Sequence, residues 1–312
     1  MKVLVTGGAG FIGSHIVDNL VERGHNVRVL DDLSSGTTAN LSSHLKEGVV
    51  DFVKGNINDS GTTRDALKGI DSVIHLAALV SVPFSMKNPS ATRAVNVDGT
   101  ANVVESCRGT SVSRFVFVSS CAVYGESEYL PIDEAHPTNP ISPYASSKLD
   151  GERQCRAYKK KGKLDVVILR LFNVYGPRQR GGDYAGVITS FLEKARKDLP
   201  LTVYGDGSQL RDFVYVQDIA DAASTALEAS SSGNGLFNIG YGKPVSINEL
   251  AETVLKVSGK NLKILHEAPR PGDIKRSVAD ISKARRMLEY SPKFPLEKGL
   301  KNLLELQSGK HK

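Results

Sequence analysis

The amino-acid sequence predicts an α/β protein: a doubly wound parallel sheet (a Rossmann fold) with a smaller mixed α/β C-terminal region. Three observations support this fold class. The first half alternates short apolar strands with helical segments, a glycine-rich turn directly follows the first strand, and beyond about Arg178 the loops lengthen and become richer in Gly, Pro and Asp. Alternating strands and helices give a parallel sheet, and right-handed crossovers place helices on both of its faces.

The individual elements are expected where short apolar runs alternate with amphipathic stretches. Strands of the main sheet are predicted at 2–6, 27–31, 49–53, 71–76, 114–119 and 166–170. A long helix is predicted at 89–107, and shorter strands at 201–204, 236–239 and 262–265. We place a first domain at 1–177 and a second region at 178–312, and we expect segments of the second region to return to the first sheet.

The composition is that of a globular protein. At 312 residues, with 40% hydrophobic and 24% charged residues, the chain is long enough for a large core and about two domains. It contains no apolar run of membrane-spanning length, so we expect no membrane partner. Because residues 1–6 form the first predicted strand, we also expect no cleavable leader.

The cysteines and the charge distribution indicate the cellular compartment and the kinds of partner to expect. The three cysteines (Cys107, Cys121 and Cys155) are odd in number, scattered and without metal-ligand spacing, which favours reduced thiols in a cytoplasmic protein and no metal site. The formal charge is +6, with its densest runs at 159–163 and 310–312. We interpret these runs as solvated helix ends rather than a nucleic-acid surface, because cations suit the C-terminal end of a helix dipole.

The turn after the first strand has the pattern of a dinucleotide-binding loop. Gly7, Gly10 and Gly13 punctuate the run TGGAGFIG at 6–13. Glycine permits a tight strand-to-helix turn, close approach of a pyrophosphate, and close packing of the helix on the strand. The free N–H groups of the helix, including those of Phe11 and Ile12, then face the phosphates. Asp31 ends the second predicted strand, where a carboxylate is expected to hold the adenine ribose hydroxyls and to repel a 2′-phosphate. The sequence therefore predicts NAD rather than NADP.

A YxxxK pair is the candidate catalytic constellation. Tyr144 and Lys148 share one face of a predicted helix that begins with Ser142 as N-cap and Pro143 as its first residue. A lysine close to a tyrosine favours the phenolate, so we expect Lys148 to lower the pKa of Tyr144 and to make it a base. Taken alone, such a pair could also be a chance arrangement on a surface helix.

The end of the fifth strand supplies hydroxyl groups to the same edge of the sheet. Ser119 and Ser120 come directly after an apolar run, and ligands bind at the carboxyl ends of parallel strands. One of these hydroxyls can bridge a substrate alcohol and Tyr144, whereas the structural alternative is a serine that only caps the strand.

Together, five motifs in order resemble the extended short-chain dehydrogenase/reductase family. They are TGGAGFIG at 6–13, HLAA at 75–78, SSCAVYG at 119–125, the YxxxK pair and RLFNVYGPRQ at 170–179, and the resemblance covers nearly the whole chain. Nucleotide-sugar epimerases and dehydratases are the most similar members. The resemblance implies that Ser120 is the catalytic serine, Tyr144 the base and Lys148 the ligand of the nicotinamide ribose.

Further residues carry over from the family pattern one by one. The resemblance implies cofactor contacts from Asn56, Ile57, Ala77, Ala78 and Asn96, although Asn56 stands where the family commonly has aspartate. It also implies substrate contacts from Asn173, Tyr204, Arg211, Arg270, Asp273 and Ser277, besides Ser120 and Tyr144. Arginine suits the diphosphate because its fork donates two hydrogen bonds at once. Surface ion pairing is the alternative explanation for Arg211 and Arg270.

The tip of the fifth strand discriminates among the family's reactions. Family dehydratases and decarboxylases carry carboxylates just before the VYG-like triplet, whereas this chain has Cys121 and Ala122. The resemblance therefore implies 4-epimerisation of a UDP-hexose, UDP-glucose or UDP-galactose, with tightly bound NAD. The alternatives are the same chemistry on an N-acetylated or uronic sugar, a reductase that releases reduced cofactor, or a cofactor-bound regulatory protein without turnover. Related proteins pair the helices near 89–108 and 143–161, so a homodimer is expected.

Overall fold

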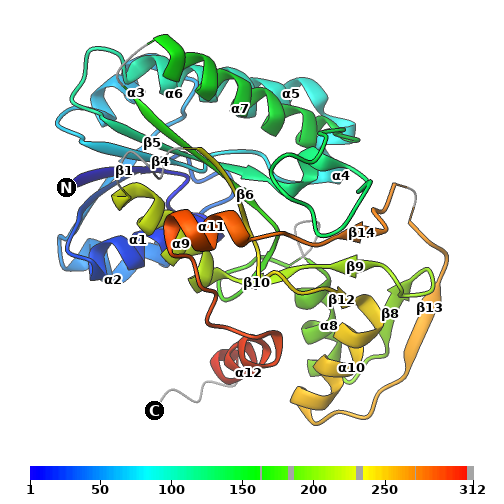
Figure 1. Ribbon diagram of the computed structural model, residues 1–312. Helices are drawn as coiled ribbons and strands as arrows, with labels where there is room; N and C mark the ends of the chain where they lie inside the picture. Colours follow the sequence, from blue (N-terminus) through cyan, green and yellow to red (C-terminus); the bar gives the residue numbers. More distant parts are fainter. Residues whose placement is uncertain (162–163, 182–185, 230–234, 271, 308–312) are drawn as a thin grey trace.

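A seven-stranded parallel sheet lies at the centre of the computed structural model, which describes residues 1–161, 164–181, 186–229, 235–270 and 272–307 (Figure 1). Its strand order is β11-β6-β5-β4-β1-β2-β3, and every pairing is parallel. The strands are β1 (Lys2–Thr6), β2 (Asn26–Asp31), β3 (Val50–Lys54), β4 (Ser72–His75), β5 (Arg114–Ser120), β6 (Asp165–Leu171) and β11 (Gly235–Ile239). The predicted doubly wound sheet is thus confirmed, with strand ends within one residue of the sequence expectation.

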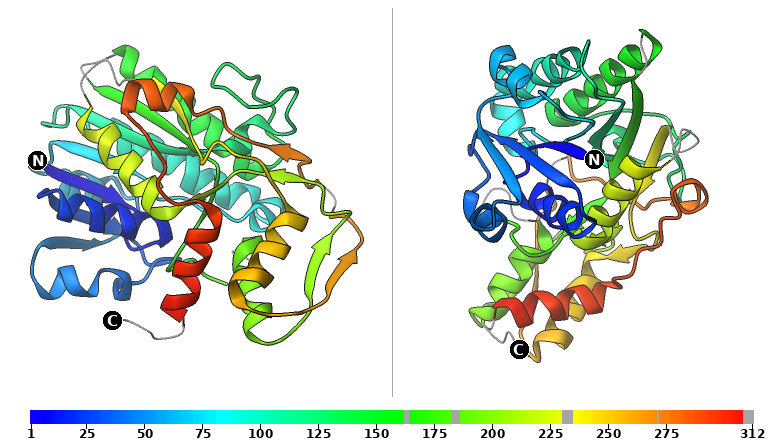
Figure 2. Two further views of the ribbon diagram at one scale, coloured as in Figure 1. Left: turned by 60° about the horizontal axis from the view of Figure 1, so that its bottom comes forward. Right: turned by 90° about the vertical axis from the view of Figure 1, so that its left-hand side faces the viewer.

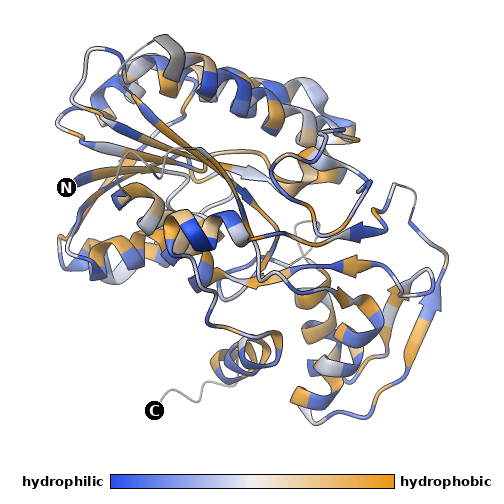
Figure 3. Ribbon diagram, in the orientation of Figure 1, coloured by the Kyte–Doolittle hydropathy of each residue, from blue (hydrophilic) through white to orange (hydrophobic). Residues whose placement is uncertain are grey.

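Both faces of the sheet are buried, which explains why its strands read as continuous apolar runs. In β1, Val3 and Val5 pack into the core on one face, whereas Leu4 packs into a second core on the other face. The central strands are correspondingly hydrophobic along their length (Figure 3). Two cores on opposite faces require helices on both sides.

Two sets of helices provide that cover. One face carries α3 (Ser60–Ala66), α6 (Thr100–Ser106) and α7 (Pro143–Lys161), and the opposite face carries α1 (Phe11–Glu22), α9 (Val216–Glu228) and α11 (Ser282–Leu288) (Figure 1). Helix α9 comes from the C-terminal half of the sequence and packs directly on α1. The first domain in sequence is therefore completed by later segments.

The helix predicted at 89–107 forms with a wider turn inside it. Helix α5 (Pro89–Arg93) continues into a π-helical segment, Ala94–Gly99, and then into α6. Gly99 lies so close to a neighbouring loop that a Cβ there would come within 2.6 Å of Asn58 Oδ1. The same segment carries Asn96, which turns inward. Single π-helical turns of this kind often mark functional positions.

The C-terminal part forms a second, smaller core (Figure 2). Its strands are β7 (Asn173–Tyr175), β8 (Leu201–Tyr204), β9 (Leu210–Arg211), β10 (Phe213–Tyr215), β12 (Val245–Ser246), β13 (Ile264–Glu267) and β14 (Arg276–Ser277). They pair as β7–β10, β8–β13 and β12–β9–β14, and the helices are α8 (Val187–Arg196), α10 (Ile247–Ser258) and α12 (Leu296–Gln307). The strand predicted at 262–265 lies two residues later in the structure, as β13.

One predicted strand of the second region belongs to the main sheet. The run at 236–239 forms β11, which pairs in parallel with β6 at the edge of the sheet. The chain reaches this position from β10 through α9, which packs under β5 and β6. The division of the sequence at residue 177 stays a prediction, since both parts contribute to one sheet.

Two further sequence expectations concern surfaces. No helix within the described ranges is long and apolar enough to cross a membrane. The basic runs at 159–163 and 310–312 fall on residues whose side chains lie outside the described part of the chain.

Candidate active site

A cavity of about 450 Å³ opens at the carboxyl edge of the central sheet. This is where open α/β sheets bind ligands. The sequence-predicted residues that line it are Gly7, Gly10, Phe11, Ile12, Gly13, Asp31, Asn56, Ile57, Ala77, Ala78, Ser120, Tyr144 and Lys148. Residues far apart in the sequence therefore meet along one wall, from the glycine turn to the YxxxK pair.

The three glycines of the turn answer three different steric demands. Gly7 has a φ of 71°, and a Cβ there would lie 2.8 Å from the backbone N of Ala77. A Cβ on Gly13 would lie 2.2 Å from Gly7 O, so the helix could not approach the strand. A Cβ on Gly10 would meet only Gly7 O, at 3.2 Å, and this residue lines the cavity. Gly7 and Gly13 are thus needed by the turn itself, whereas Gly10 leaves room for a ligand.

The end of β2 supplies the acidic side of the cavity. Asp31 is buried, and its two carboxylate oxygens accept hydrogen bonds from Ala9 N at 3.0 Å and Leu33 N at 2.8 Å. Burial raises the pKa of this carboxyl, while the two backbone hydrogen bonds oppose the rise. Its neighbour Asp32 is exposed and accepts a hydrogen bond from Asn56 Nδ2 at 3.1 Å. The amide of Asn56, where the family commonly has aspartate, therefore faces a carboxylate.

Asn96 lies behind the cavity wall. It is buried, and its side chain accepts from Leu79 N at 2.7 Å and donates to Leu79 O and Ser147 Oγ, both at 2.9 Å. Leu79 lines the cavity next to Ala77 and Ala78. Asn96 therefore fixes the loop after β4 and its distance from α7, and its contact to the cofactor stays a prediction.

Helix α7 begins as its sequence predicts. Ser142 Oγ accepts from Ala145 N at 3.2 Å, and Pro143 occupies the first helical position. Tyr144 and Lys148 then face the cavity from consecutive turns. The Ser120 hydroxyl lies close enough to the Tyr144 phenol to lower its pKa, and Lys148 Nζ donates to Val118 O at 2.9 Å. The catalytic serine, tyrosine and lysine expected from the sequence are therefore brought together.

The expected lowering of the pKa of Tyr144 by Lys148 is not what the structure shows. Burial raises the pKa of Tyr144 to about 12, and the hydrogen bond from Ser120 opposes this only in part. Burial also lowers the pKa of Lys148 to about 8. The Lys148 ammonium donates its hydrogen bond to the carbonyl of Val118. Burial therefore raises the pKa of Tyr144 by more than the positive charge of Lys148 lowers it.

Of the substrate residues expected in the second region, Ser277 approaches the tip of β5. Ser277 is buried in β14, and its Oγ lies 3.9 Å from Sγ of Cys121, the residue after Ser120. In the sheet register Ser277 is opposite Arg211, which forms an ion pair with Asp273 at 2.6 Å. Strands β9 and β14 thus carry polar side chains up to the tip of β5.

Tyr204, Arg270 and Asn173, also expected to bind substrate, do not line the cofactor cavity. The Arg270 guanidinium stacks on the ring of Tyr204 at 3.8 Å, although the adjacent Pro271 of the RPGD motif lies outside the described residues. Asn173 opens β7, and its Oδ1 is buried without a hydrogen-bond partner among the described residues. A buried acceptor of this kind normally finds a donor, so Asn173 can accept a hydrogen bond from a ligand.

Sequence reasoning missed several residues of the site. Arg178, Gln179 and Arg180 line the cavity; the first two end the quoted RLFNVYGPRQ motif and Arg180 directly follows it. Asp212 is fully buried and accepts backbone hydrogen bonds from Tyr241, Gly242 and Ala279. The basic side chains could have been inferred from the motif, whereas the role of Asp212 depends on loops that meet only in the folded protein.

The cavity fits a nicotinamide dinucleotide. Gly10 offers an open backbone to a pyrophosphate at the N-terminus of α1, and the carboxylate of Asp31 stands at the end of β2. Lys148 and Tyr144 stand at the opposite end, beside β5. A backbone cradle, a carboxylate at the end of β2 and a tyrosine–lysine pair beside β5 are therefore present in the order that a dinucleotide cofactor requires.

Known proteins share this architecture. The pattern of the NAD dependent epimerase/dehydratase family matches residues 3–240. The chain is 39% identical to a UDP-glucose 4-epimerase of Mycolicibacterium smegmatis over 307 residues, covering 98% of each chain. A crystal structure of UDP-glucose 4-epimerase from Thermotoga maritima with UDP-glucose has a TM-score of 0.93 at 35% identity, covering 99% of each chain. UDP-N-acetylglucosamine 4-epimerase of Methanobrevibacter ruminantium, in complex with UDP-N-acetylmuramic acid, has a TM-score of 0.94 at 37% identity, also covering 99% of each chain.

The acidic end of the cavity should set the choice of cofactor. We expect cofactor-free protein to bind NAD at least roughly tenfold more tightly than NADP, about 1.4 kcal/mol, because Asp31 repels a 2′-phosphate. Asp31→Asn should narrow this preference, whereas Asp32→Asn at the exposed neighbouring position should change it less. Calorimetric titration of all three proteins with both cofactors measures the preference, and equal affinities of the wild type would show that Asp31 does not contact the ribose.

Proposed function

This chain belongs to the NAD dependent epimerase/dehydratase family, and we propose that it catalyses the reversible 4-epimerisation of a UDP-hexose. The hexose is UDP-glucose or UDP-galactose, and the reaction passes through a 4-keto sugar with tightly bound NAD. The observation that carries this proposal is the meeting of Ser120, Tyr144 and Lys148 at one end of the cofactor cavity, beside a strand tip without carboxylates.

The strand tip supports epimerisation over dehydration or decarboxylation. Cys121 and Ala122 follow Ser120 directly, in the 3-10 turn Cys121–Tyr124. Burial raises the pKa of the Cys121 thiol to about 11, so this side chain is neutral at neutral pH and supplies neither an acid nor a base of useful strength. The groups that remain can move one proton at a hydroxyl, which is all that inversion at C4 asks of the protein.

Proton transfer is assigned to Tyr144 and Ser120. Tyr144 takes the proton of the sugar 4-hydroxyl and returns it in the second half of the reaction, and Ser120 bridges the phenol and that hydroxyl. NAD, when bound, supplies the hydride acceptor for C4 and a positive charge near Tyr144 that favours the phenolate. Lys148, with a pKa of about 8, is mostly protonated at neutral pH and adds positive charge to the same end of the cavity.

Small side chains leave the sugar room to turn. After oxidation the keto sugar must present its opposite face before it is reduced again. Cys121, Ala122 and Ser277 stand where the sugar would move, and none of them is bulky. Arg211 and Arg270 are assigned to the diphosphate, because arginine forks suit it. Asn173 is assigned to a hydroxyl or N–H donor of the nucleotide sugar, because its free Oδ1 accepts hydrogen bonds.

The proposal also includes a cytoplasmic location and a homodimeric assembly. The three cysteines are free thiols, and Cys107 and Cys155 are buried, which suits a reducing cytoplasm.

The surface formed by α5, α6 and α7 is assigned to a homodimer interface, in which the two helical layers of one protomer pack on those of its partner. The α5–α6 segment and α7 contact each other side by side in the structure, so they present one continuous helical surface (Figure 1).

The base assignment is tested by one substitution. Tyr144→Phe should keep the fold and bound NAD but lose roughly 10²–10⁴-fold in turnover, the usual contribution of a positioned acid–base group. Tyr158→Phe, at the other end of the same helix, is the control and should leave turnover unchanged. NMR of UDP-galactose incubated without added reductant measures conversion to UDP-glucose. Near-normal conversion by Tyr144→Phe would refute the assignment, and no conversion by wild type would refute the substrate.

The small side chain of Ser277 predicts that the substrate range includes N-acetylated sugars. A serine leaves space where a bulky aromatic would exclude a 2-N-acetyl group, so wild type should also epimerise UDP-N-acetylglucosamine. Ser277→Tyr should lose that activity while retaining activity on UDP-glucose. Arg276→Tyr, at the exposed neighbouring position of β14, is the matched control. A wild type that ignores the N-acetylated sugar, or a Ser277→Tyr protein that accepts it equally well, would contradict the pocket argument.

The assembly prediction has a direct readout. The protein should be a homodimer at micromolar concentration, with a mass of about twice 33.6 kDa by light scattering. A monomer under these conditions would exclude the helical surface as a stable interface.

A further inference from the structure

Three consecutive residues at the end of β5 are tied to three residues spaced one turn apart on α7. Val118 O accepts from Lys148 Nζ at 2.9 Å and Ser119 Oγ donates to Glu152 Oε1 at 2.6 Å. The Ser120 hydroxyl lies close enough to the Tyr144 phenol to lower its pKa. Positions 144, 148 and 152 lie four residues apart and therefore share one face of the helix. The mechanism uses Ser120, Tyr144 and Lys148, but it assigns no part to Glu152.

Glu152 is itself held by a buried arginine. Arg170 Nε donates to Glu152 Oε1 at 2.8 Å and Arg170 Nη2 to Oε2 at 2.7 Å, a two-pronged ion pair. Glu152 is 1% exposed and Arg170 is 3% exposed. In the register of the sheet, Arg170 of β6 lies directly opposite Ser119 of β5. The carboxylate thus joins two neighbouring strands to the helix that covers them, one residue before Ser120.

Close packing makes this joint rigid. Gly151 precedes Glu152, and a Cβ at Gly151 would lie 2.6 Å from the ring of Phe117 on β5. A glycine inside a helix costs about 1 kcal/mol relative to alanine, yet here it lets α7 lie directly on the strand. Arg170 also stacks on the ring of Tyr124 at 4.6 Å, so its guanidinium is fixed from a third side.

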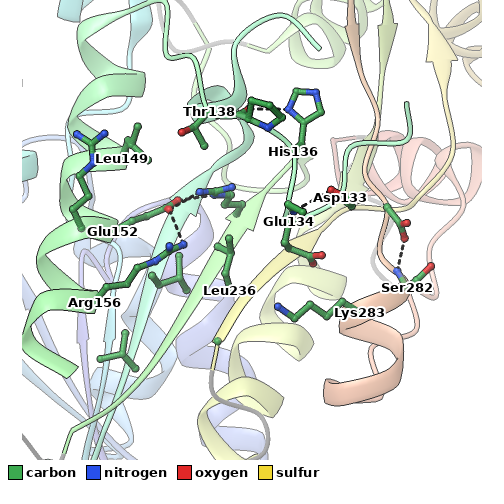
Figure 4. A pocket seen from close by; sticks show the side chains of 18 of the residues that line it. Asp133, Glu134, His136, Thr138, Leu149, Glu152, Arg156, Leu236, Ser282 and Lys283 are labelled. Atoms are coloured by element: carbon green, nitrogen blue, oxygen red, sulfur yellow. Dashed lines mark hydrogen bonds and ion pairs between the residues drawn. The ribbon is translucent and has the colours of Figure 1, made fainter. Parts of the chain in front are cut away.

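The pair is reached from outside the catalytic cavity. Glu152, Arg170 and Arg156 line a separate cavity of about 1020 Å³, which Tyr144 and Lys148 do not line. Glu152 and Arg156 are labelled at this cavity in Figure 4. Arg156 approaches Glu152 Oε2 at 3.5 Å from the rim of this cavity. The ion pair therefore belongs to the wall of this second cavity, whereas Ser120, Tyr144 and Lys148 line the first.

Charge on Glu152 acts on Lys148. Burial lowers the pKa of Lys148 to about 8, whereas Cys155 and Glu152 oppose that shift. Burial raises the pKa of the Cys155 thiol and lowers that of the facing His75 to about 3, so both are uncharged at neutral pH. Tyr144, with a pKa of about 12, is neutral as well. Glu152 therefore remains as the negative charge beside Lys148, one helical turn away, with Arg170 on its far side.

We propose that Glu152 is a positioning residue for the reaction: its carboxylate, held by Arg170, ties α7 to the tip of β5 and keeps Ser120, Tyr144 and Lys148 in register. The proposal rests on the proposed function for its kinetic consequence. Its structural consequence, the environment of Lys148, holds independently of the substrate. A purely structural ion pair would instead affect stability alone.

The test uses Glu152→Gln, which keeps the shape of the side chain and removes its charge. Turnover per NAD-loaded protein should fall roughly 10- to 100-fold, because small misplacements of reacting groups carry losses of that order, while KM changes much less. The alkaline limb of the kcat–pH profile should move to lower pH. In cofactor-free protein labelled with [¹³C]lysine, the Cε resonance of Lys148 should titrate below the wild-type pKa of about 8.

Two controls separate positioning from stability. Asp165→Asn weakens the ion pair of Arg114 with Asp165, which lie opposite each other at the far end of the same two strands, and should leave kcat and the Lys148 titration unchanged. Glu152→Leu/Arg170→Met replaces the buried pair by apolar groups, an exchange that buried pairs often tolerate in folding. This double variant should fold and still show the kinetic loss.

Each outcome decides the proposal. An unchanged Lys148 titration in Glu152→Gln, or wild-type kcat in the folded double variant, would overturn it. If wild type fails to convert any UDP-hexose, the proposed function is wrong, and the Lys148 titration alone then decides whether Glu152 controls that site.

Discussion

The close packing of α7 on β5 is the constraint on which the site depends. Gly151 lets the helix lie directly against Phe117, and the side chains at 144, 148 and 152 then reach the last three residues of the strand. Without that contact, the hydroxyl of Ser120 on β5 and the phenol of Tyr144 on α7 would not meet. Because the strands of a parallel sheet all end at the same edge, the sheet decides where Ser120 lies. The helix decides how Tyr144 and Lys148 are placed relative to it.

The second wall of the site comes from segments that return late in the sequence. Ile132 N donates to Val278 O at 2.8 Å and Asp280 N to Ile132 O at 2.7 Å, so the chain after β14 runs along the loop that follows β5. Asp212 collects three backbone N–H groups from the loops that flank this contact, and burial raises its pKa to about 6. The cofactor side and the substrate side are therefore joined by buried hydrogen bonds rather than by a flexible linker.

Burial disfavours the charged forms of the titratable groups at the site. Burial holds Tyr144 and Cys121 neutral and reduces the basicity of Lys148. A phenol with a pKa of about 12 is a poor base by itself, so its activation requires positive charge at the same end of the cavity. The protein contributes the ammonium of Lys148 there. The negative charge of Glu152 opposes the lowering of the Lys148 pKa by burial.

The sequence by itself determined the parallel sheet, the glycine turn with Asp31, and the meeting of Ser120, Tyr144 and Lys148, because these depend on local periodicity and on motifs at fixed spacing. It left the place of β11 in the main sheet, the carboxylate of Asp212 and the triad of Ser119, Glu152 and Arg170 to the tertiary structure. Each of these joins segments far apart in the chain, and no local pattern marks such a pairing. The pKa of Tyr144 was wrongly predicted for the same reason: sequence spacing shows that Lys148 is near, but burial, which only the folded protein sets, decides the sign.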